Sequence, residues 1–120
     1  MPSFKTTKFL EDIRQNENAP AIDMLLESDF TKEIRIVFRN GQTMQKHQTP
    51  FPIVVELIEG TLDFTIYDGD TAPEKLNLEK GDLISVQAGI PHDLSATSDC
   101  IARLTLSKGD TKERVDKVIS

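Results

Sequence analysis

Apolar and polar residues alternate over short stretches along most of this 120-residue chain. The period of two is plain in residues 34–38 and again in residues 62–66, where every second residue is Ile, Leu or Phe. Successive side chains of a β-strand point to opposite faces, so this alternation predicts strands that bury one face only. A chain patterned in this way has to pair its strands into sheets that share one apolar interior.

Turn-forming residues separate the alternating stretches. Asn40-Gly41, Asp68-Gly69-Asp70 and Lys80-Gly81-Asp82 are typical of tight turns, and the two prolines at 50 and 52 indicate a bend. We therefore predict about nine short strands, near residues 22–26, 34–38, 42–48, 53–58, 62–66, 76–78, 83–86, 92–96 and 100–106. Nine strands with no intervening helices predict an all-β fold, an antiparallel jelly-roll barrel.

Helical spacing is confined to the two ends of the chain. Phe9, Leu10 and Ile13 would share one face of a short helix over residues 7–14, with Thr7 as its cap. Three apolar residues at 115, 118 and 119 show similar spacing. We expect an N-terminal helix or arm over residues 1–20, a barrel over 21–107 and a C-terminal helical tail over 108–120.

Composition excludes several kinds of partner. The formal charge is −6, and no run of Lys and Arg forms a stripe that could neutralise successive phosphates, which argues against nucleic acid. No segment approaches the roughly 18 consecutive apolar residues of a membrane span, and the first residues lack the pattern of a secretory signal. Cys100 is the only cysteine, so no intrachain disulfide can form, and we expect a buried, inert thiol in a cytoplasmic protein.

Two segments contain the residues of a known pair of motifs. Gly41, His47 and Gly60 fit the first pattern, which is Gly, five residues, His, one residue, His, three or four residues, Glu, six residues and Gly. The second pattern is Gly, five residues, Pro, one residue, Gly, two residues, His, three residues and Asn. Gly81, Gly89 and His92 fit it, whereas Gln87 and Ala96 depart from it.

In these residues the chain resembles the cupin superfamily, and in particular its small single-domain members. The resemblance covers residues 41–96 and implies a double-stranded β-helix, or jelly-roll barrel. It also implies that His47 and His92 occupy metal-ligand positions of the family. Thr49 and Ile53 stand where the family has a second His and a Glu, so half of the usual ligand set is absent.

Strict alternation along the strands predicts the lining of a pocket. Residues two apart point the same way, so Gln45, Thr49 and Ile53 should face inward with the two histidines. Arg103 could clamp a carboxylate ligand, although an exposed surface arginine is the commoner case. The predicted pocket thus contains Gln45, His47, Thr49, Ile53, His92 and Arg103.

The sequence leaves the function of such a pocket open. We expect the barrel to bind a small organic molecule such as an acid or a sugar. A divalent metal on His47 and His92, with zinc, nickel or iron suited to the imidazoles, is the alternative to a pocket without metal. With a metal the chain would be an oxygenase or an isomerase. Without a metal, a pocket histidine could act as a general base. A third alternative is a purely structural dimer whose pocket is vestigial. Because a long sheet edge invites pairing, we also expect a homodimer.

Overall fold

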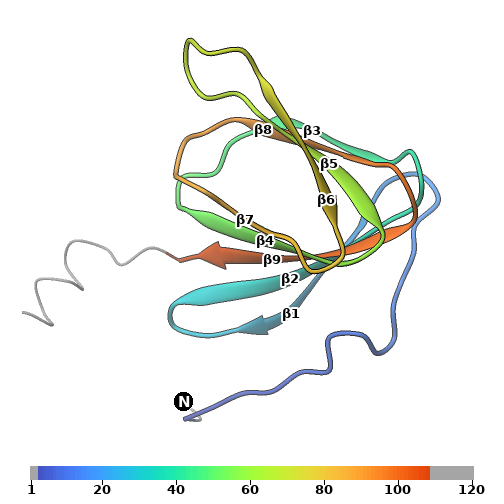
Figure 1. Cartoon of the computed structure of the whole chain (residues 1–120). Coiled ribbons are helices and arrows are strands. Elements are labelled where there is room, and N and C mark those ends of the chain that lie inside the picture. The colour runs from blue at the N-terminus through green and yellow to red at the C-terminus, as the bar shows by residue number, and fades with distance from the viewer. Residues whose placement is uncertain (1–2, 109–120) are drawn as a thin grey trace, which may run out of the picture.

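The structure is a computed structural model, and it describes residues 3–108. The nine strands of this region are β1 (Ala21–Glu27), β2 (Thr31–Phe38), β3 (Thr43–His47), β4 (Ile53–Glu59), β5 (Thr61–Ile66), β6 (Glu74–Glu79), β7 (Leu83–Val86), β8 (His92–Ala96) and β9 (Cys100–Ser107). All nine predicted strands are confirmed to within a few residues (Figure 1). Within residues 3–108, no helix has the length and apolar character needed to cross a membrane.

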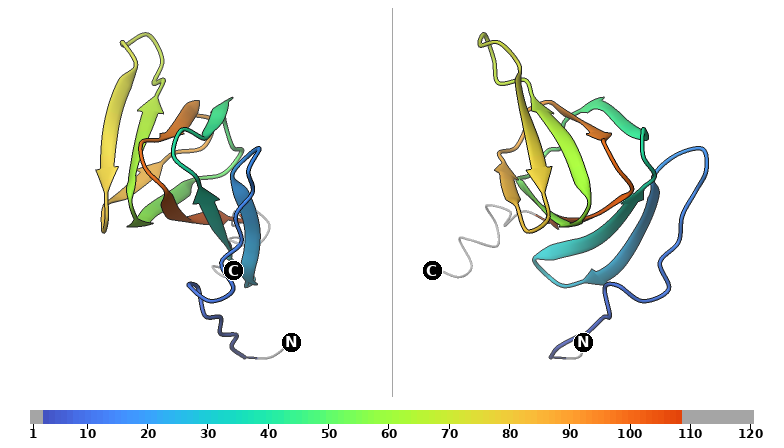
Figure 2. Two further views of the ribbon diagram at one scale, coloured as in Figure 1. Left: turned by 90° about the vertical axis from the view of Figure 1, so that its right-hand side faces the viewer. Right: turned by 45° about the vertical axis from the view of Figure 1, so that its right-hand side comes forward.

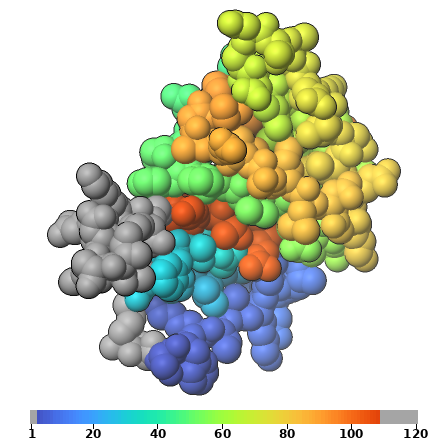
Figure 3. Space-filling model, turned by 60° about the vertical axis from the view of Figure 1, so that its left-hand side comes forward, coloured from blue at the N-terminus to red at the C-terminus, as the bar shows by residue number. Residues whose placement is uncertain are grey.

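Two antiparallel sheets enclose one core. The larger sheet has the strand order β1-β2-β9-β4-β7 and the smaller one the order β3-β8-β5-β6. In the space-filling view, β9 (red) runs between β2 (cyan) and β4 (green), as this order requires (Figure 3). The predicted all-β jelly-roll fold is confirmed.

The core lies between the two sheets and is filled with apolar side chains. Every strand from β2 to β9 contributes to it, since the inward positions alternate with polar outward ones. Phe38, Leu57, Leu62 and Phe64 are fully enclosed. The interior is therefore largely packed, and any site has to lie where this packing ends.

The N-terminal segment is an arm, and the helix predicted over residues 7–14 is wrong. Residues 3–20 run outside the barrel before entering β1 (Figure 2). The buried Arg35 holds this arm, because its Nη1 donates to the carbonyl oxygens of Phe9 and Glu11 at 2.9 Å each and its Nη2 donates to Asp12 O at 3.2 Å. Carbonyl groups turned toward a guanidinium no longer point along a helix axis. A helix of eight residues is too marginal to compete with these bonds.

The C-terminal helix predicted within residues 108–120 falls almost wholly on residues 109–120, outside the described part of the chain. The last described strand ends at Ser107. Lys108 then follows, and its Nζ forms an ion pair with Glu27 at 2.8 Å.

Candidate functional site

His47 and His92 lie directly opposite each other on neighbouring strands of the smaller sheet. They are cross-strand partners in the β3–β8 ladder, so both side chains project from the same face. Their ring centroids are 4.5 Å apart and the planes meet at 63°, edge to face. The two histidines of the sequence therefore form one pair.

A β-bulge brings His47 to the inner face. The β3–β8 register shifts between Met44, which faces Leu94, and His47, which faces His92. Gln45 and Lys46 of β3 thus oppose the single residue Asp93 of β8, and Met44 and His47 both point inward although they are an odd number apart. The parity argument that placed Gln45 inward is wrong for this reason, and Gln45 is exposed.

Backbone hydrogen bonds fix the tautomer of both rings. The Nδ1 of His47 lies 2.7 Å from Gln45 O, and the Nδ1 of His92 lies 2.9 Å from Ile90 O. A carbonyl oxygen only accepts hydrogen bonds, so in each neutral ring Nδ1 carries the proton and Nε2 keeps its lone pair. Each of the two neighbouring rings, when neutral, therefore offers one unprotonated nitrogen.

The surroundings keep His92 in the neutral form. Only 1% of its surface is exposed, and its ring stacks on Phe64. Burial lowers the pKa of His92 below its ordinary value, and His47 adds to this effect, while the bond to Ile90 O opposes it. His47 is only half-buried, so it forms the side of the pair that meets solvent.

The strand register extends the histidine pair into a row across the sheet. Ile66 on β5 lies opposite His92, and Glu74 on β6 lies opposite Ile66. The row thus contains the two histidines, an apolar residue and an exposed carboxylate. Nothing in the sequence marks Glu74, because only the pairing of β5 with β6 places it on this row.

The side chains of the other predicted pocket residues are exposed or engaged elsewhere. Thr49 Oγ1 donates to Phe51 O at 2.9 Å within the bend, and Ile53 is buried among core residues. Arg103 is exposed on the outer face of the larger sheet, where its Nε donates to Glu33 Oε1 at 3.0 Å. The structure therefore brings together the side chains of His47 and His92, whereas Gln45 contacts the pair only through its carbonyl oxygen and Arg103 lies on the other sheet.

Glu33 explains the direction of Arg103. Burial alone would raise the pKa of Glu33, but hydrogen bonds from Thr105, Arg103 and Thr31 outweigh it, and the pKa is lowered. The carboxylate therefore stays charged beneath the arm and holds the guanidinium there.

A second polar group lies on the opposite side of the strand that carries His92. The hydroxyl of Tyr67 donates to Asp93, which raises the pKa of Tyr67, and Lys46 Nζ lies 4.1 Å from the centre of the Tyr67 ring. Asp93 follows His92 directly and so points outward, as the alternation predicts. These contacts link β3 and β8 to Tyr67, the residue that follows β5.

No protein-family model and no curated protein sequence matches the chain. Several solved structures are similar to the chain. An RmlC-like cupin protein from Desulfovibrio desulfuricans is 22% identical with a TM-score of 0.74, over 87% of this chain and 96% of its own. An uncharacterised conserved protein with a double-stranded β-helix domain from Klebsiella pneumoniae is 17% identical with a TM-score of 0.75, over 89% and 92% of the two chains. The chain has the cupin fold.

The cupin fold is also present in an enzyme with metal centres. Oxalate decarboxylase of Bacillus subtilis, a protein with Mn(II) centres, is 21% identical with a TM-score of 0.64 over 72% of this chain. The match covers 23% of that longer enzyme. At such low identities the structural similarity shows a shared fold. Any activity has to be argued from the residues of this chain.

The residues of this cupin fold do not fit a metal centre made of protein ligands. Among residues 3–108, no three His, Cys, Asp or Glu side chains converge on one point. Ile53 packs in the core and the Thr49 hydroxyl is used within its own bend, so neither replaces the missing ligands. Two neutral imidazoles also leave a divalent charge uncompensated.

The lone cysteine takes no part in the site. Cys100 is buried in the core at the start of β9, and burial raises the pKa of its thiol to about 12. A thiol held protonated at neutral pH is a poor nucleophile and a poor metal ligand, in line with the inert role expected for it.

Proposed function

We propose that this cupin-fold protein binds a small organic molecule beside His47 and His92, with the two Nε2 atoms accepting hydrogen bonds from it. The observation that carries the proposal is that each Nδ1 faces a backbone carbonyl oxygen. This arrangement leaves the Nε2 atoms of two neighbouring rings without a hydrogen-bond partner among the described residues. A ligand that supplies donors could therefore bond to both rings without displacing a protein hydrogen bond.

The chemistry of the pair restricts the ligand. It has to supply O–H or N–H donors, as the hydroxyl groups of a sugar or the protonated carboxyl group of a small acid do. Ile66, opposite His92 on β5, and Ile90, in the turn before β8, are partly buried against the core and would contact the carbon skeleton of the ligand. The packed interior favours a ligand that lies across the barrel end, with His47 the more accessible of the two rings.

Catalysis by a histidine base, without metal, is the second candidate. The observation that favours it is the protonation state, because a neutral imidazole with an unprotonated Nε2 is what a general base requires. His92 is the stronger candidate for this base, since burial keeps it neutral over a wider pH range. Base catalysis would add proton abstraction to the binding already proposed.

A thermal-shift screen of small organic acids and sugars tests the binding proposal. Ligands that bind only the folded state raise the unfolding temperature through linkage. We expect at least one such compound to raise it for the wild-type chain and for Gln45→Ala, whose side chain is exposed near His47. The rise should be lost in His47→Phe, which keeps a ring but removes both nitrogens.

Two results would count against binding at the histidines. One is that no compound in a broad library stabilises the chain. The other is an equal shift in His47→Phe and the wild type, which would place the ligand elsewhere. Each stabilising compound should then be incubated with the chain and followed by NMR. Turnover that disappears in His92→Phe, while binding through His47 is weakened but measurable, would support the base.

The partners and the cellular location expected from the sequence are also proposed here. We propose a small-molecule ligand and a second copy of the chain as partners, with neither nucleic acid nor membrane, in the cytoplasm. Size-exclusion chromatography of the natural protein from its own cells, with and without added salt, would test the absence of nucleic acid.

A further inference from the structure

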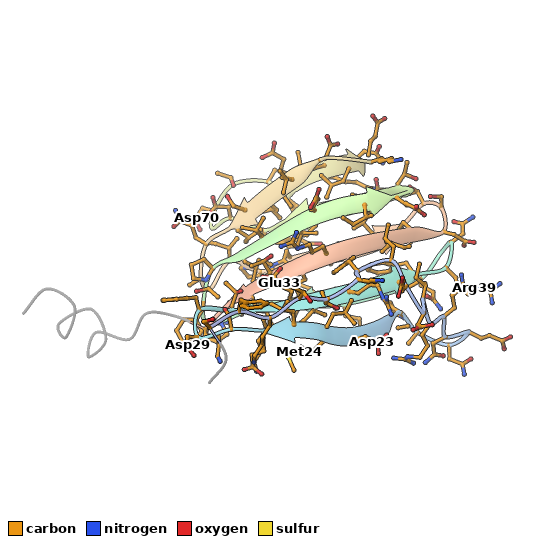
Figure 4. The ribbon with its side chains drawn as sticks, turned by 90° about the horizontal axis from the view of Figure 1, so that it is seen from below. Asp23, Met24, Asp29, Glu33, Arg39 and Asp70 are labelled. Atoms are coloured by element: carbon orange, nitrogen blue, oxygen red, sulfur yellow. The ribbon has the colours of Figure 1, made fainter. Side chains whose placement is uncertain are left out.

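A cleft lies between the N-terminal arm and the outer face of the larger sheet. Its volume is about 450 Å³, within the range typical of small-molecule sites. The sheet contributes Leu26, Glu33, Ile58 and Arg103 to its lining, and the arm contributes residues 5–7, 9 and 10. Figure 4 views the larger sheet from below and labels Glu33. The cleft is thus on the other sheet from the histidine pair.

Strand register brings the sheet residues of the cleft together. Leu26 on β1 lies opposite Glu33 on β2, because a bulge after Met24 shifts the pairing. Glu33 in turn lies opposite Thr105 on β9, and Arg103 is two residues from Thr105, so these side chains project from the same face. An apolar residue and an ion pair are therefore neighbours in the cleft.

Arg103 is held in place and still has hydrogen-bond donors to offer. Its Nε donates to Glu33 Oε1 at 3.0 Å, and the same oxygen accepts a hydrogen bond from Thr105 Oγ1 at 2.6 Å. Within residues 3–108, no group accepts a hydrogen bond from Nη1 or Nη2 of Arg103, and the side chain is 45% exposed. The protein thus orients the guanidinium through Nε and leaves its two terminal nitrogens for a ligand.

Much of the remaining lining is apolar. Phe9 and Ile58 pack against a small apolar cluster on the outer face, and Leu10 is 49% exposed. A carbon chain that covers these side chains would be removed from water together with them, which favours binding. A charged group beside an apolar wall is typical of a site for a molecule with one charged end and one apolar end.

We propose that this cleft binds a small monocarboxylate with an apolar carbon chain, whose carboxylate accepts hydrogen bonds from Nη1 and Nη2 of Arg103. The planar guanidinium matches a carboxylate in a bidentate pair. A single negative charge fits better than the two charges of a phosphate, because Glu33 lines the cleft and Glu56 lies opposite Arg103 on β4. The carboxylate expected at Arg103 from the sequence is thereby assigned to the outer face and not to the barrel interior.

Titration with octanoate, followed by calorimetry and ¹H–¹⁵N NMR, tests this site. We expect saturable binding, with the largest shifts at Arg103 Nε and at the amides of residues 5–10. Arg103→Gln should weaken the binding at least about tenfold, because it removes the charge-assisted pair. Arg39→Gln removes the same charge from an exposed arginine directly after β2, and this control should bind as the wild type does. The uncharged 1-octanol should bind the wild type more weakly than octanoate.

A second pair of variants tests the apolar wall. Leu10→Asp should weaken octanoate binding, whereas Ile13→Asp, on the same arm but outside the lining of the cleft, should leave it unchanged. Both side chains are exposed, and thermal unfolding establishes that each variant is folded.

Three results would overturn the proposal. One is the absence of saturable octanoate binding, and another is equal affinity in the wild type, Arg103→Gln and Leu10→Asp. The third is loss of octanoate binding in His47→Phe, which would place the molecule at the histidine pair. Binding that persists in His47→Phe and is weakened in Arg103→Gln is the expected result, and it does not depend on the function proposed for the histidines.

Discussion

The ring of Phe64 lies almost parallel to the ring of His92, with centroids 5.3 Å apart and an angle of 17° between the planes. Phe64 is completely buried, so it forms an apolar floor beneath one face of the imidazole. The ring of His47 contacts His92 edge to face, and the Nδ1 edge faces Ile90 O. The Nε2 edge is therefore the part of His92 left for a ligand.

Burial of His92 predicts a loss of stability in mild acid. The unfolded chain takes up a proton at His92 near pH 6.5, whereas the folded chain, with its lowered pKa, does not. The unfolded state then binds more protons, so the free energy of unfolding falls as pH drops below that value, until the folded pKa is reached. One proton accounts for at most about 1.4 kcal/mol per pH unit.

Urea denaturation at several pH values from about 7 down to about 5 measures this decline. The variant His92→Phe keeps an aromatic ring on Phe64 and cannot titrate, so its decline over the same range should be smaller. An identical pH dependence in the variant and the wild type would show that His92 is protonated as readily when folded as when unfolded.

We predict that the purified chain holds little metal. Two neutral imidazoles without a third protein ligand among residues 3–108 bind a divalent ion only weakly. Elemental analysis of untagged protein, after dialysis, should therefore find well below one zinc, nickel, iron or manganese per chain. A content near one that disappears in His47→Phe would contradict this reading of the site.

Loss of Arg35 should release the N-terminal arm. Three backbone carbonyl groups of the arm depend on its guanidinium, and a hydrogen bond from a charged group contributes about 1.5–3 kcal/mol. We predict that trypsin cleaves after Lys8 or Arg14 at least about tenfold faster in Arg35→Ala, since tenfold corresponds to about 1.4 kcal/mol. Arg103→Ala, which removes an exposed arginine bonded to Glu33, is the control. Equal cleavage of both variants would mean that Arg35 does not secure the arm.

Gly60 should tolerate substitution less well than Gly41, although both have positive φ, at 85° and 89°. A Cβ at Gly60 would lie 2.6 Å from Cys100 Cβ and would also overlap Asp99 O, whereas a Cβ at Gly41 would meet nothing within 4 Å. We predict that Gly41→Ala costs about 1–2 kcal/mol, from the left-handed backbone alone. Gly60→Ala should cost roughly 1–3 kcal/mol more, from overpacking. Equal losses in chemical denaturation would contradict the close approach.

The sequence predicts most of the fold because the strand pattern and the turn residues, both local features, are consistent with the same structure along the chain. Alternating apolar residues define each strand, and glycines such as Gly41, Gly60 and Gly81 stand where the chain needs positive φ. The N-terminal helix failed because its competitor is distant in sequence. Arg35 lies on β2, and nothing in residues 7–14 reveals that a buried guanidinium will bind their carbonyl groups.

The candidate site is predicted only in part for a similar reason. The motif spacing placed His47 and His92 together, and the structure does so as well. The bulge after Met44 depends on how β3 pairs with β8, so the alternation along β3 alone assigned Gln45 to the wrong face. Arg103 was misplaced because Glu33, which draws its guanidinium to the outer face, is distant in the sequence.

Binding at the histidine pair requires an unprotonated Nε2 in each of the two neighbouring rings, and nitrogen NMR of the imidazoles measures this protonation directly. The chain has only two histidines, so an untagged, ¹⁵N-labelled sample gives one pair of signals per ring. At neutral pH we predict a proton on Nδ1 and none on Nε2 in both neutral rings, with both Nε2 signals shifting when a ligand binds. A proton on Nε2 of either neutral ring would contradict the account.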